Sequence, residues 1–565
     1  MKYRYLIIFT FLFITSSCRL DRQRENSNRQ GILAEKAMVV SAHQLASQVG
    51  IDVLKNGGNA IDAAVAVHFA LAVVYPGAGN IGGGGFLVYR TNKGEFYTLD
   101  YREKAPENAT RDMYVNDSGE VDNEKSRLGH LATGVPGSVD GMVTAHGKFG
   151  NLSWEELIIP AIRLAEDGFL LTEKEASKLN NARERIEKFN TINPENLIRD
   201  SWQKGDMIYY NDLAKTLLNI AKNGRAGFYK GETANLIVKE MERGNGLITH
   251  IDLENYSSVW RNPIQFNYKE YQITSMGPPS SGGVAIAQLF SMIEQFPVKD
   301  WGIDDIQSIH AIVESEKLVF ADRAKYLGDP DFVHIPIYKL IDSTYNIGRA
   351  AEISFNNTRL AENVTAGPIV QEHEETTHFS IIDQFGNAVA STTTLNGGFG
   401  NHVVVGGAGF FLNNEMDDFS AKPGSPNMYG LVGGEANAIV PAKRMLSSMT
   451  PTIVEKEGEL FMVVGTPGGS TIITSVFQTI LNVVDFGLNM QGAVDFPRFH
   501  HQWKPDYIQY ENDRFVKQTF EELRVLGHSF EERSAIGRVD AILVLDDGTL
   551  EGAADPRGDD AAMGF

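Results

Sequence analysis

The sequence pattern of the chain changes abruptly near residue 376. Upstream of it, apolar residues recur at helical spacing from about 153 to 243 and again from 308 to 326. A polar stretch follows from about 356 to 375, and segments 377–382 and 388–394 then alternate as two strands around the turn 383–387. This pattern predicts an α/β or α+β fold whose first part is mainly helical and whose second part is rich in strands.

Further elements are expected on both sides of this change. Ser153 and Thr172 are expected to cap helices, and the glycine run 82–85 is expected to let backbone pass near a pocket or between sheets. The other expected helices are 44–54, 59–74 and 471–483, and the other expected strands are 86–90, 96–101, 452–455 and 461–464. The formal net charge of −21 argues against nucleic acid as a partner, because phosphate binding needs a basic surface.

The first residues have the pattern of an export signal. Lys2 and Arg4 precede an apolar stretch, residues 5–14, that is too short to span a bilayer. Cys18 is the only cysteine, and it stands where such a signal is cut. Either Cys18 is incidental, or it carries a lipid, which the small residues before it favour. We expect residues 1–17 to be a signal peptide, residues 18–36 a flexible tether, and the mature protein to be exported to a bacterial periplasm or outer envelope, where a lipid on Cys18 would be its only membrane contact.

Thr376 is the candidate catalytic residue at the start of the second part. By itself it is an ordinary strand residue, since threonine is common in sheets. A zinc-binding helix over this segment is excluded, because His373 and His378 are five residues apart rather than four. Thr394 and Asn396 end the next strand, so we expect them to lie close to Thr376.

Other polar segments supply the groups that an amide-cleaving site for an amino-acid head group needs. These groups are carboxylates, hydroxyls and bare backbone amides. They occur in 415–418, in Ser447 and Ser448, and in Gly468 and Gly469.

Several long motifs occur in order along the chain. They are DYREKAP at 100–106, GPPSSGG at 277–283, the stretch 376–396, LNNEMDDF at 412–419, KRMLSSMTP at 443–451, GTPGGS at 465–470 and DPR at 555–557. Together they closely resemble the γ-glutamyltransferase family, from about Ala37 to the C-terminus. The resemblance implies the N-terminal-nucleophile hydrolase superfamily and a four-layer αββα sandwich, built jointly by a large subunit, residues 37–375, and a small catalytic subunit, residues 376–565.

The resemblance also implies a catalytic mechanism. The precursor would cut itself between Glu375 and Thr376, which leaves Thr376 with a nucleophilic hydroxyl and a new α-amine of reference pKa about 8 as the base. Thr394 would orient Thr376, and the backbone N–H groups of Gly468 and Gly469 would form the oxyanion hole. The rival reading of 468–470 as a phosphate loop fails because the lysine of such loops is missing. The family pattern implies no cofactor and no metal.

The implied substrates are γ-glutamyl donors such as glutathione, with water, amino acids or peptides as acceptors. The donor's α-carboxylate would be held by Arg102, Ser447 and Ser448, and its ammonium by Asn396, Glu415 and Asp418. Segment 420–433 resembles the family's lid loop, with Tyr429 as its closing residue, and such a lid favours small substrates over polymers. Two alternatives stay open: a related acylase for a glutaryl-type side chain, and an uncleaved envelope protein that only binds peptides.

Overall fold

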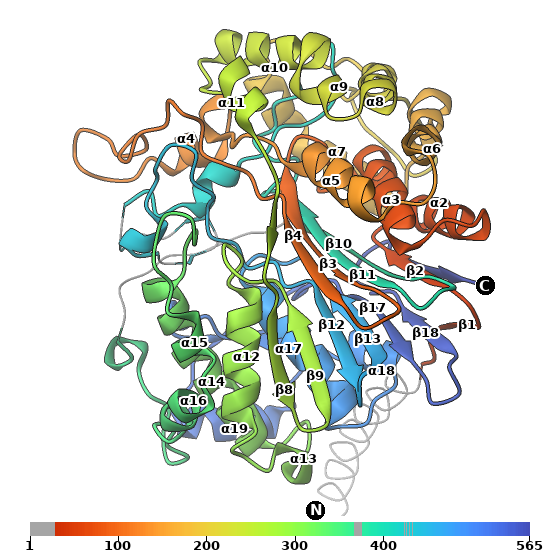
Figure 1. Cartoon of the computed structure of the whole chain (residues 1–565). Coiled ribbons are helices and arrows are strands. Elements are labelled where there is room, and N and C mark those ends of the chain that lie inside the picture. The colour runs from red at the N-terminus through yellow and green to blue at the C-terminus, as the bar shows by residue number, and fades with distance from the viewer. Residues whose placement is uncertain are drawn as a thin grey trace, which may run out of the picture.

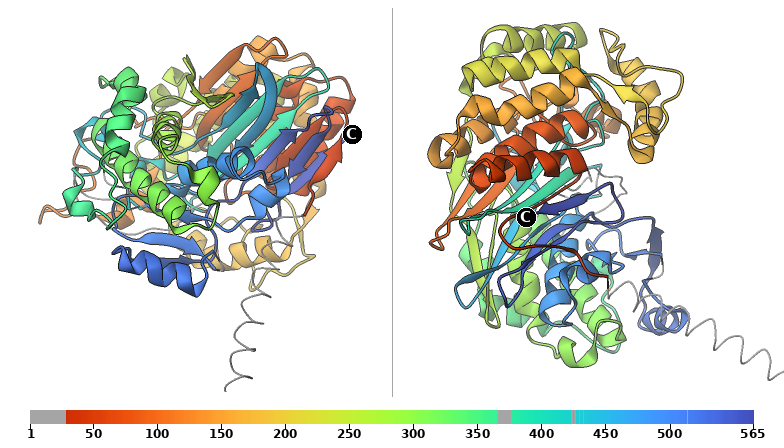
Figure 2. Two further views of the ribbon diagram at one scale, coloured as in Figure 1. Left: turned by 90° about the horizontal axis from the view of Figure 1, so that it is seen from below. Right: turned by 90° about the vertical axis from the view of Figure 1, so that its right-hand side faces the viewer.

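Two seven-stranded sheets face each other in the computed structural model, and helices cover the outer side of each (Figure 1; Figure 2). The structure describes residues 29–365, 376–422, 424, 427–428, 430–431, 433–512 and 514–565. The four-layer αββα sandwich that the resemblance implied is therefore confirmed. In the described part, no helix has both the length and the hydrophobicity that crossing a membrane requires.

The first sheet carries helices on the face that points away from the second sheet. Its strand order is β19 (Ala561–Gly564), β2 (Met38–Ser41), β10 (Thr376–Ile382), β11 (Ala388–Thr394), β3 (Gly84–Arg90), β4 (Phe96–Asp100) and β7 (Val259–Arg261). The covering helices are α2 (Gln44–Lys55), α3 (Ala60–Val74) and α5 (Ser138–Phe149). Outside them, α6 (Trp154–Asp167) packs on α3, and α8 (Asn211–Asn223) packs on α6.

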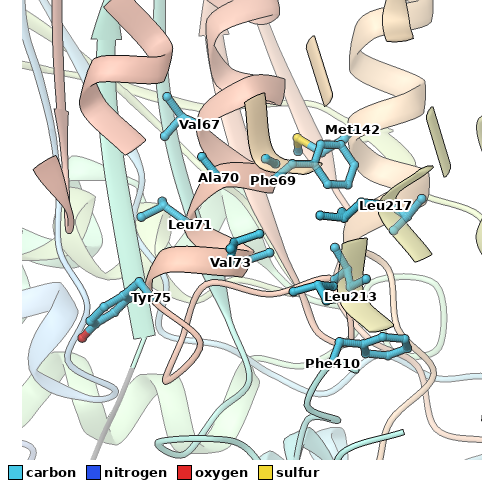
Figure 3. Packing of buried hydrophobic residues seen from close by; sticks show 14 of the residues in the cluster. Val67, Phe69, Ala70, Leu71, Val73, Tyr75, Met142, Leu213, Leu217 and Phe410 are labelled. Atoms are coloured by element: carbon cyan, nitrogen blue, oxygen red, sulfur yellow. The ribbon is translucent and has the colours of Figure 1, made fainter. Parts of the chain in front are cut away.

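Helix α3 lies at the centre of this helical layer, and every one of its residues is buried. Its alanines and valines are small enough to pack closely against neighbours on all sides. Phe69 and Val73 point to the side where Met142 and Leu213 lie (Figure 3). The side chain of Asn59 caps the helix by accepting from two backbone N–H groups of its first turn.

The second sheet is covered on its own outer face. Its strand order is β1 (Ile32–Ala34), β18 (Leu550–Ala553), β17 (Asp540–Val544), β13 (Glu459–Gly465), β12 (Thr452–Lys456), β9 (Tyr271–Ser275) and β8 (Ile264–Tyr268). The covering helices are α12 (Gly282–Ile293), α14 (Ile306–Tyr326), α17 (Thr471–Val484) and α18 (Met490–Asp495).

Further helices and strands complete the two halves. The helices are α4 (Asn123–Arg127), α7 (Glu173–Phe189), α9 (Ala226–Tyr229), α10 (Gly231–Gly244), α11 (His250–Asn255), α13 (Val298–Trp301), α15 (Ile337–Leu340), α16 (Ser343–Ala350) and α19 (Lys517–Val525). The strands are β5 (Phe169–Leu170), β6 (Met207–Ile208), β14 (Phe499–His500), β15 (Ile508–Glu511) and β16 (Phe530–Arg533).

Strands from before and after residue 376 alternate in both sheets. In the first sheet, β10 and β11 lie between β2 and β3, and in the second, the block from β18 to β12 lies between β1 and β9. The two parts of the chain are therefore interlocked by backbone hydrogen bonds. A break in the chain before Thr376 would leave both sheets intact.

Most of the expected elements are present, with small differences at their ends. Ser153 and Thr172 cap α6 and α7, each in a reciprocal capping box with the glutamate three residues later. The fold begins earlier than the sequence predicted, however. Residues 32–34 form β1 and pair with β18, so this part of the expected tether belongs to the sheet.

Candidate active site

Thr376 is the first residue of β10 and lies directly opposite Thr394 of β11. Residues opposite each other in an antiparallel pair point to the same face, so the two threonines are neighbours. Four residues further along β10, on the same face, Ser380 donates from Oγ to the carbonyl of Asp540 in the second sheet, at 3.0 Å. This face of β10 therefore looks into the space between the sheets. Thr376 is buried and lines a cavity there.

Thr394 is held from two sides. Its Oγ1 accepts from the backbone N–H of Asn396 at 2.7 Å, and its carbonyl accepts from Nδ2 of Asn80 at 2.9 Å. Oδ1 of Asn80 in turn accepts from the N–H of Gly83 at 3.0 Å and from Oγ of Ser138 at 2.7 Å. Asn80 therefore ties the end of β11 to the start of β3, a role that no motif in the sequence indicated.

Gly468 and Gly469 lie between β13 and α17, and Gly469 reaches the cavity wall. Their φ angles are 139° and 48°, in the region that favours glycine. The carbonyl of Gly468 accepts from the N–H of Thr471 at 2.9 Å as the helix begins. The positive end of the helix dipole is thus directed at the wall that carries Gly469.

Arg102 follows β4 and is almost fully buried at the cavity. Nη1 donates to Glu415, and Nη2 donates to Asp418, both in the 3-10 turn η3 (Glu415–Asp418). Nε and Nη2 also reach the carbonyls of Met445 and Leu446, each at 3.3 Å. The arginine that was expected at one end of the head group is therefore paired with the carboxylates expected at the other end.

Three carboxyl groups surround this single guanidinium. Besides Glu415 and Asp418, Oε2 of Glu103 lies 3.5 Å from Nη1 of Arg102. Burial raises the pKa of Glu103 to about 7 and that of Asp418 to about 6, and burial together with Glu103 raises the pKa of Glu415 well above its usual range. Because charged carboxylates are costly here, a ligand that brings an ammonium group would be favoured.

Ser447 and Ser448 form another part of the cavity wall. Oγ of Ser447 accepts from the backbone N–H of Met449 at 3.1 Å. Oγ of Ser448 accepts from Nη2 of Arg323 at 3.1 Å. Arg323 also lines the cavity, and sequence reasoning missed it. Its signal was weak: a charged residue within a predicted amphipathic helix is normally solvent-exposed.

Asn396 and the loop after η3 complete the cavity. Asn396 has a φ of 71° and donates from Nδ2 to the carbonyl of Asn414 at 3.0 Å. From the predicted lid, Asn427 donates to Oδ1 of Asp418 at 3.0 Å, and Leu431 lines the cavity. Three predicted residues lie outside the described part of the chain: Glu375, Tyr429 and Cys18.

Comparison with known proteins now identifies the family. Residues 46–565 match the family model described as gamma-glutamyltranspeptidase. The chain belongs to the gamma-glutamyltranspeptidase family. It is 45% identical over 542 residues to the glutathione hydrolase proenzyme of Escherichia coli (strain K12), which covers 94% of this chain and 93% of that relative.

Solved structures agree with membership of the gamma-glutamyltranspeptidase family. The cephalosporin acylase from Bacillus halodurans has a TM-score of 0.82 at 27% identity, covering 95% of this chain and 97% of that one. The gamma-glutamyltranspeptidase of Helicobacter pylori has a TM-score of 0.57 at 42% identity, covering 60% of this chain and 97% of that one.

The residues that the gamma-glutamyltranspeptidase resemblance singled out meet at one place. The cavity brings together Arg102, Thr376, Thr394, Asn396, Glu415, Asp418, Ser447, Ser448 and Gly469, and Gly468 directly precedes Gly469. They come from segments before and after residue 376. Both parts of the chain are therefore needed to build the site.

Among the described residues, the one group arranged like metal ligands belongs to the buried core. His310 Nδ1 lies 2.8 Å from His528 Nε2, and Glu314 is beside them. The ammonium of Lys317 donates to Glu314 at 2.9 Å, so this carboxylate is already paired with a positive charge. None of these residues lines the cavity that holds Thr376.

Proposed function

We propose that this protein is a self-cleaving precursor of a γ-glutamyltransferase and glutathione hydrolase in which Thr376 is the nucleophile. The observation that carries the proposal is the position of Thr376, which begins a strand on the wall of a cavity shared with Arg102, Ser447 and Ser448. The relatives described as glutathione hydrolase proenzymes support it.

In the precursor, the hydroxyl of Thr376 attacks the carbonyl carbon of residue 375. The peptide C–N bond breaks as the ester forms, and the nitrogen leaves as the α-amine of Thr376. Water then hydrolyses the ester, which restores the hydroxyl and leaves Glu375 as a C-terminal carboxylate. Before the cut this nitrogen is an amide without basicity, and after it a useful fraction of the amine is unprotonated near neutral pH.

In catalysis, the amine takes the proton of the Thr376 hydroxyl as the oxygen attacks the γ-carbonyl of the donor. Backbone N–H groups of Gly468 and Gly469 stabilise the oxyanion, and Thr394 orients the nucleophile. The proton passes to the leaving amine, and a γ-glutamyl ester remains on Thr376. Water or the amine of an amino acid or peptide then attacks this ester and regenerates the enzyme.

The head group of the donor is held by residues around Arg102. We propose that its α-carboxylate binds Arg102, Ser447 and Ser448, and that its ammonium binds Asn396, Glu415 and Asp418. A zwitterion suits this site, since it offers an anion to the guanidinium of Arg102 and a cation to the carboxylates of Glu415 and Asp418. A glutaryl group lacks the ammonium, so the surplus of carboxylates disfavours the acylase alternative.

The decisive experiment separates cleavage from simple binding. On a denaturing gel, the purified protein should give two fragments, the smaller being residues 376–565, about a third of the chain. N-terminal sequencing should start at Thr376, and the protein should release glutamate from glutathione. Thr376→Ala should stay full length and inactive, while Thr377→Ala, whose side chain points to the opposite face of β10, should still be cut.

A single full-length band that still consumes glutathione would overturn the proposal. A single band that binds peptides and releases no glutamate would favour the binding protein instead. After cleavage, we expect the large subunit, residues 37–375, and the small subunit to remain together, because both contribute strands to both sheets. Gel filtration without denaturant should recover them in one peak.

Segment 420–433, with Tyr429, is proposed as a lid that limits the site to small donors. Its described residues support this, because Asn427 contacts Asp418 and Leu431 lines the cavity. Replacing 420–433 by a short glycine-serine linker should raise the rate with poly-γ-glutamate relative to glutathione. An unchanged ratio would refute the lid.

Export and lipidation are a separate proposal, supported by the apolar stretch 5–14 and by Cys18. We propose that residues 1–17 direct the protein out of a bacterial cytoplasm and that Cys18 is lipidated. Labelled palmitate should be incorporated into the parent and not into Cys18→Ser. Equal labelling of both would refute lipidation at this position.

A further inference from the structure

Arg323 is a second buried arginine on the wall of the cavity, near the end of α14. Its Nε donates to Oγ of Ser281 at 2.9 Å, and its Nη2 donates to Oγ of Ser448 at 3.1 Å. These two contacts place a guanidinium directly behind the serine pair. Arg102, by contrast, is turned toward Glu415 and Asp418.

These hydrogen bonds settle which groups donate and which accept. A guanidinium only donates, so Ser281 and Ser448 accept from Arg323. Ser281 then donates from Oγ to the carbonyl of Ser447 at 2.7 Å. Ser448 accepts from Arg323 and lines the cavity, so its own hydroxyl proton can be donated to a ligand there. Oγ of Ser447 accepts from the N–H of Met449 in the same way. Both hydroxyls can therefore donate to an anion in the cavity.

The charges around the cavity also point to a role for Arg323 in binding an anion. Three carboxyl groups, Glu103, Glu415 and Asp418, lie against the single guanidinium of Arg102. An anionic ligand approaching Arg102 alone would meet a guanidinium that is already paired with Glu415 and Asp418. Arg323 supplies a second cation, and its field reaches Asp418. It is the cation that touches the serines.

We propose that Arg323 orients Ser448 to bind the α-carboxylate of the acyl donor, and that its charge gives the site its preference for donors with that carboxylate. The inference rests on the proposed γ-glutamyl chemistry and names a residue that sets which donors the site prefers. Arg323 is a positioning residue, since it acts through Ser448, through Ser281 and through its charge.

Three matched anilide donors test the idea, with release of the aniline as the readout. The γ-glutamyl anilide has both head groups, the glutaryl anilide keeps only the carboxylate, and the 4-aminobutyryl anilide keeps only the ammonium. Arg323→Gln should lower kcat/KM for the first two by roughly 10- to 100-fold, as the loss of a hydrogen bond to a charged group does, mainly through KM. For the third donor, kcat/KM should change by less than about threefold.

Lys325→Gln is the matched control, because it removes a cation from an exposed position on the same helix. It should leave all three donors unchanged. If Arg323→Gln does not fold or is not cleaved, Arg323→Lys decides, since lysine keeps the charge but cannot reach both serines with a planar fork. Relative to the parent, Arg323→Lys should still raise the ratio of kcat/KM for the 4-aminobutyryl donor to kcat/KM for the γ-glutamyl donor.

A double-mutant cycle tests whether Arg323 acts through Ser448. In the parent and in a Ser448→Ala background, we compare the factor by which Arg323→Gln lowers kcat/KM for the γ-glutamyl donor. The factor in the Ser448→Ala background should be less than half of the factor in the parent. An equal loss for all three donors, or no loss for any of them, would overturn the inference while the parent's activity upheld the proposed function. A parent inactive on the γ-glutamyl donor would overturn both.

Discussion

Gly83 offers the sharpest test of how the candidate site is built. It lies just before β3, where its N–H donates to Asn80 and its carbonyl accepts from the N–H groups of Gly137 and Ser138. A Cβ at this position would lie 2.8 Å from Oδ1 of Asn80 and closer still to the carbonyl oxygen of Thr394. Gly83→Ala therefore forces two hydrogen-bonded backbone segments apart.

The expected loss follows from what has to move. Overpacking by one methyl group typically costs about 1–3 kcal/mol, and the upper end applies where the obstacle is backbone rather than a flexible side chain. We expect Gly83→Ala to lower the free energy of unfolding by about 3 kcal/mol. Gly147 in α5 is the matched control, because it is exposed and a Cβ there meets nothing within 4 Å. Gly147→Ala should stabilise the protein by about 0.5–1 kcal/mol.

Both changes are best measured in a Thr376→Ala background, so that each variant is a single chain. Unfolding by urea is then monitored through tryptophan fluorescence. With Thr376 restored, Gly83→Ala should also cleave more slowly than the parent, because the displaced carbonyl belongs to Thr394, the partner of Thr376. A Gly83→Ala protein as stable as Gly147→Ala would refute the reasoning.

Three further changes test other parts of the structure by the same unfolding assay. Asn80→Ala should destabilise by about 3 kcal/mol, because it removes the five hydrogen bonds of a buried side chain, and a loss below about 1 kcal/mol would contradict the role of Asn80. Ser153→Ala should cost about 1 kcal/mol through loss of the α6 cap, against no measurable loss for the exposed Ser118→Ala. Burial lowers the pKa of His378 to about 3, so its contribution to stability is present above pH 6.5 and is lost as the pH falls toward 3, when only the unfolded chain takes up the proton. Between pH 7 and pH 5 the parent should therefore lose about 2 kcal/mol more than His378→Gln, and parallel pH profiles would contradict this.

Local patterns predicted the elements that hold Thr376. The alternation in 388–394 and the turn after residue 382 depend on neighbours in sequence, and β10 and β11 pair as expected. The caps at Ser153 and Thr172 are equally local. Strand β1 was missed because it pairs with residues 550–552, far away in the chain, and its own three residues carry no distinct pattern.

The interior of the site was predicted less completely. The motifs gave the residues around the cavity, but Asn80 and Arg323 have their effect through contacts with Thr394 and Ser448 that only the folded chain brings about. The pairing of Arg102 with Glu415 and Asp418 was also not foreseen. It follows from the cost of burying charges without partners, because a buried guanidinium and buried carboxylates stabilise one another when they pair.

The strand pairing explains how a new chain end can serve as a catalytic group. A free N-terminus normally frays, since few contacts hold it. Thr376 is different, because its pairing with Thr394 is the first of a ladder that continues through all of β10, and β10 is also paired with β2 from Phe379 onward. Under the proposed mechanism, cleavage therefore frees an amine without freeing the strand that carries it. The α-amine of Thr376 remains beside the hydroxyl of the same residue and opposite Thr394. It begins a strand that pairs with β11 along its length and with β2 further on.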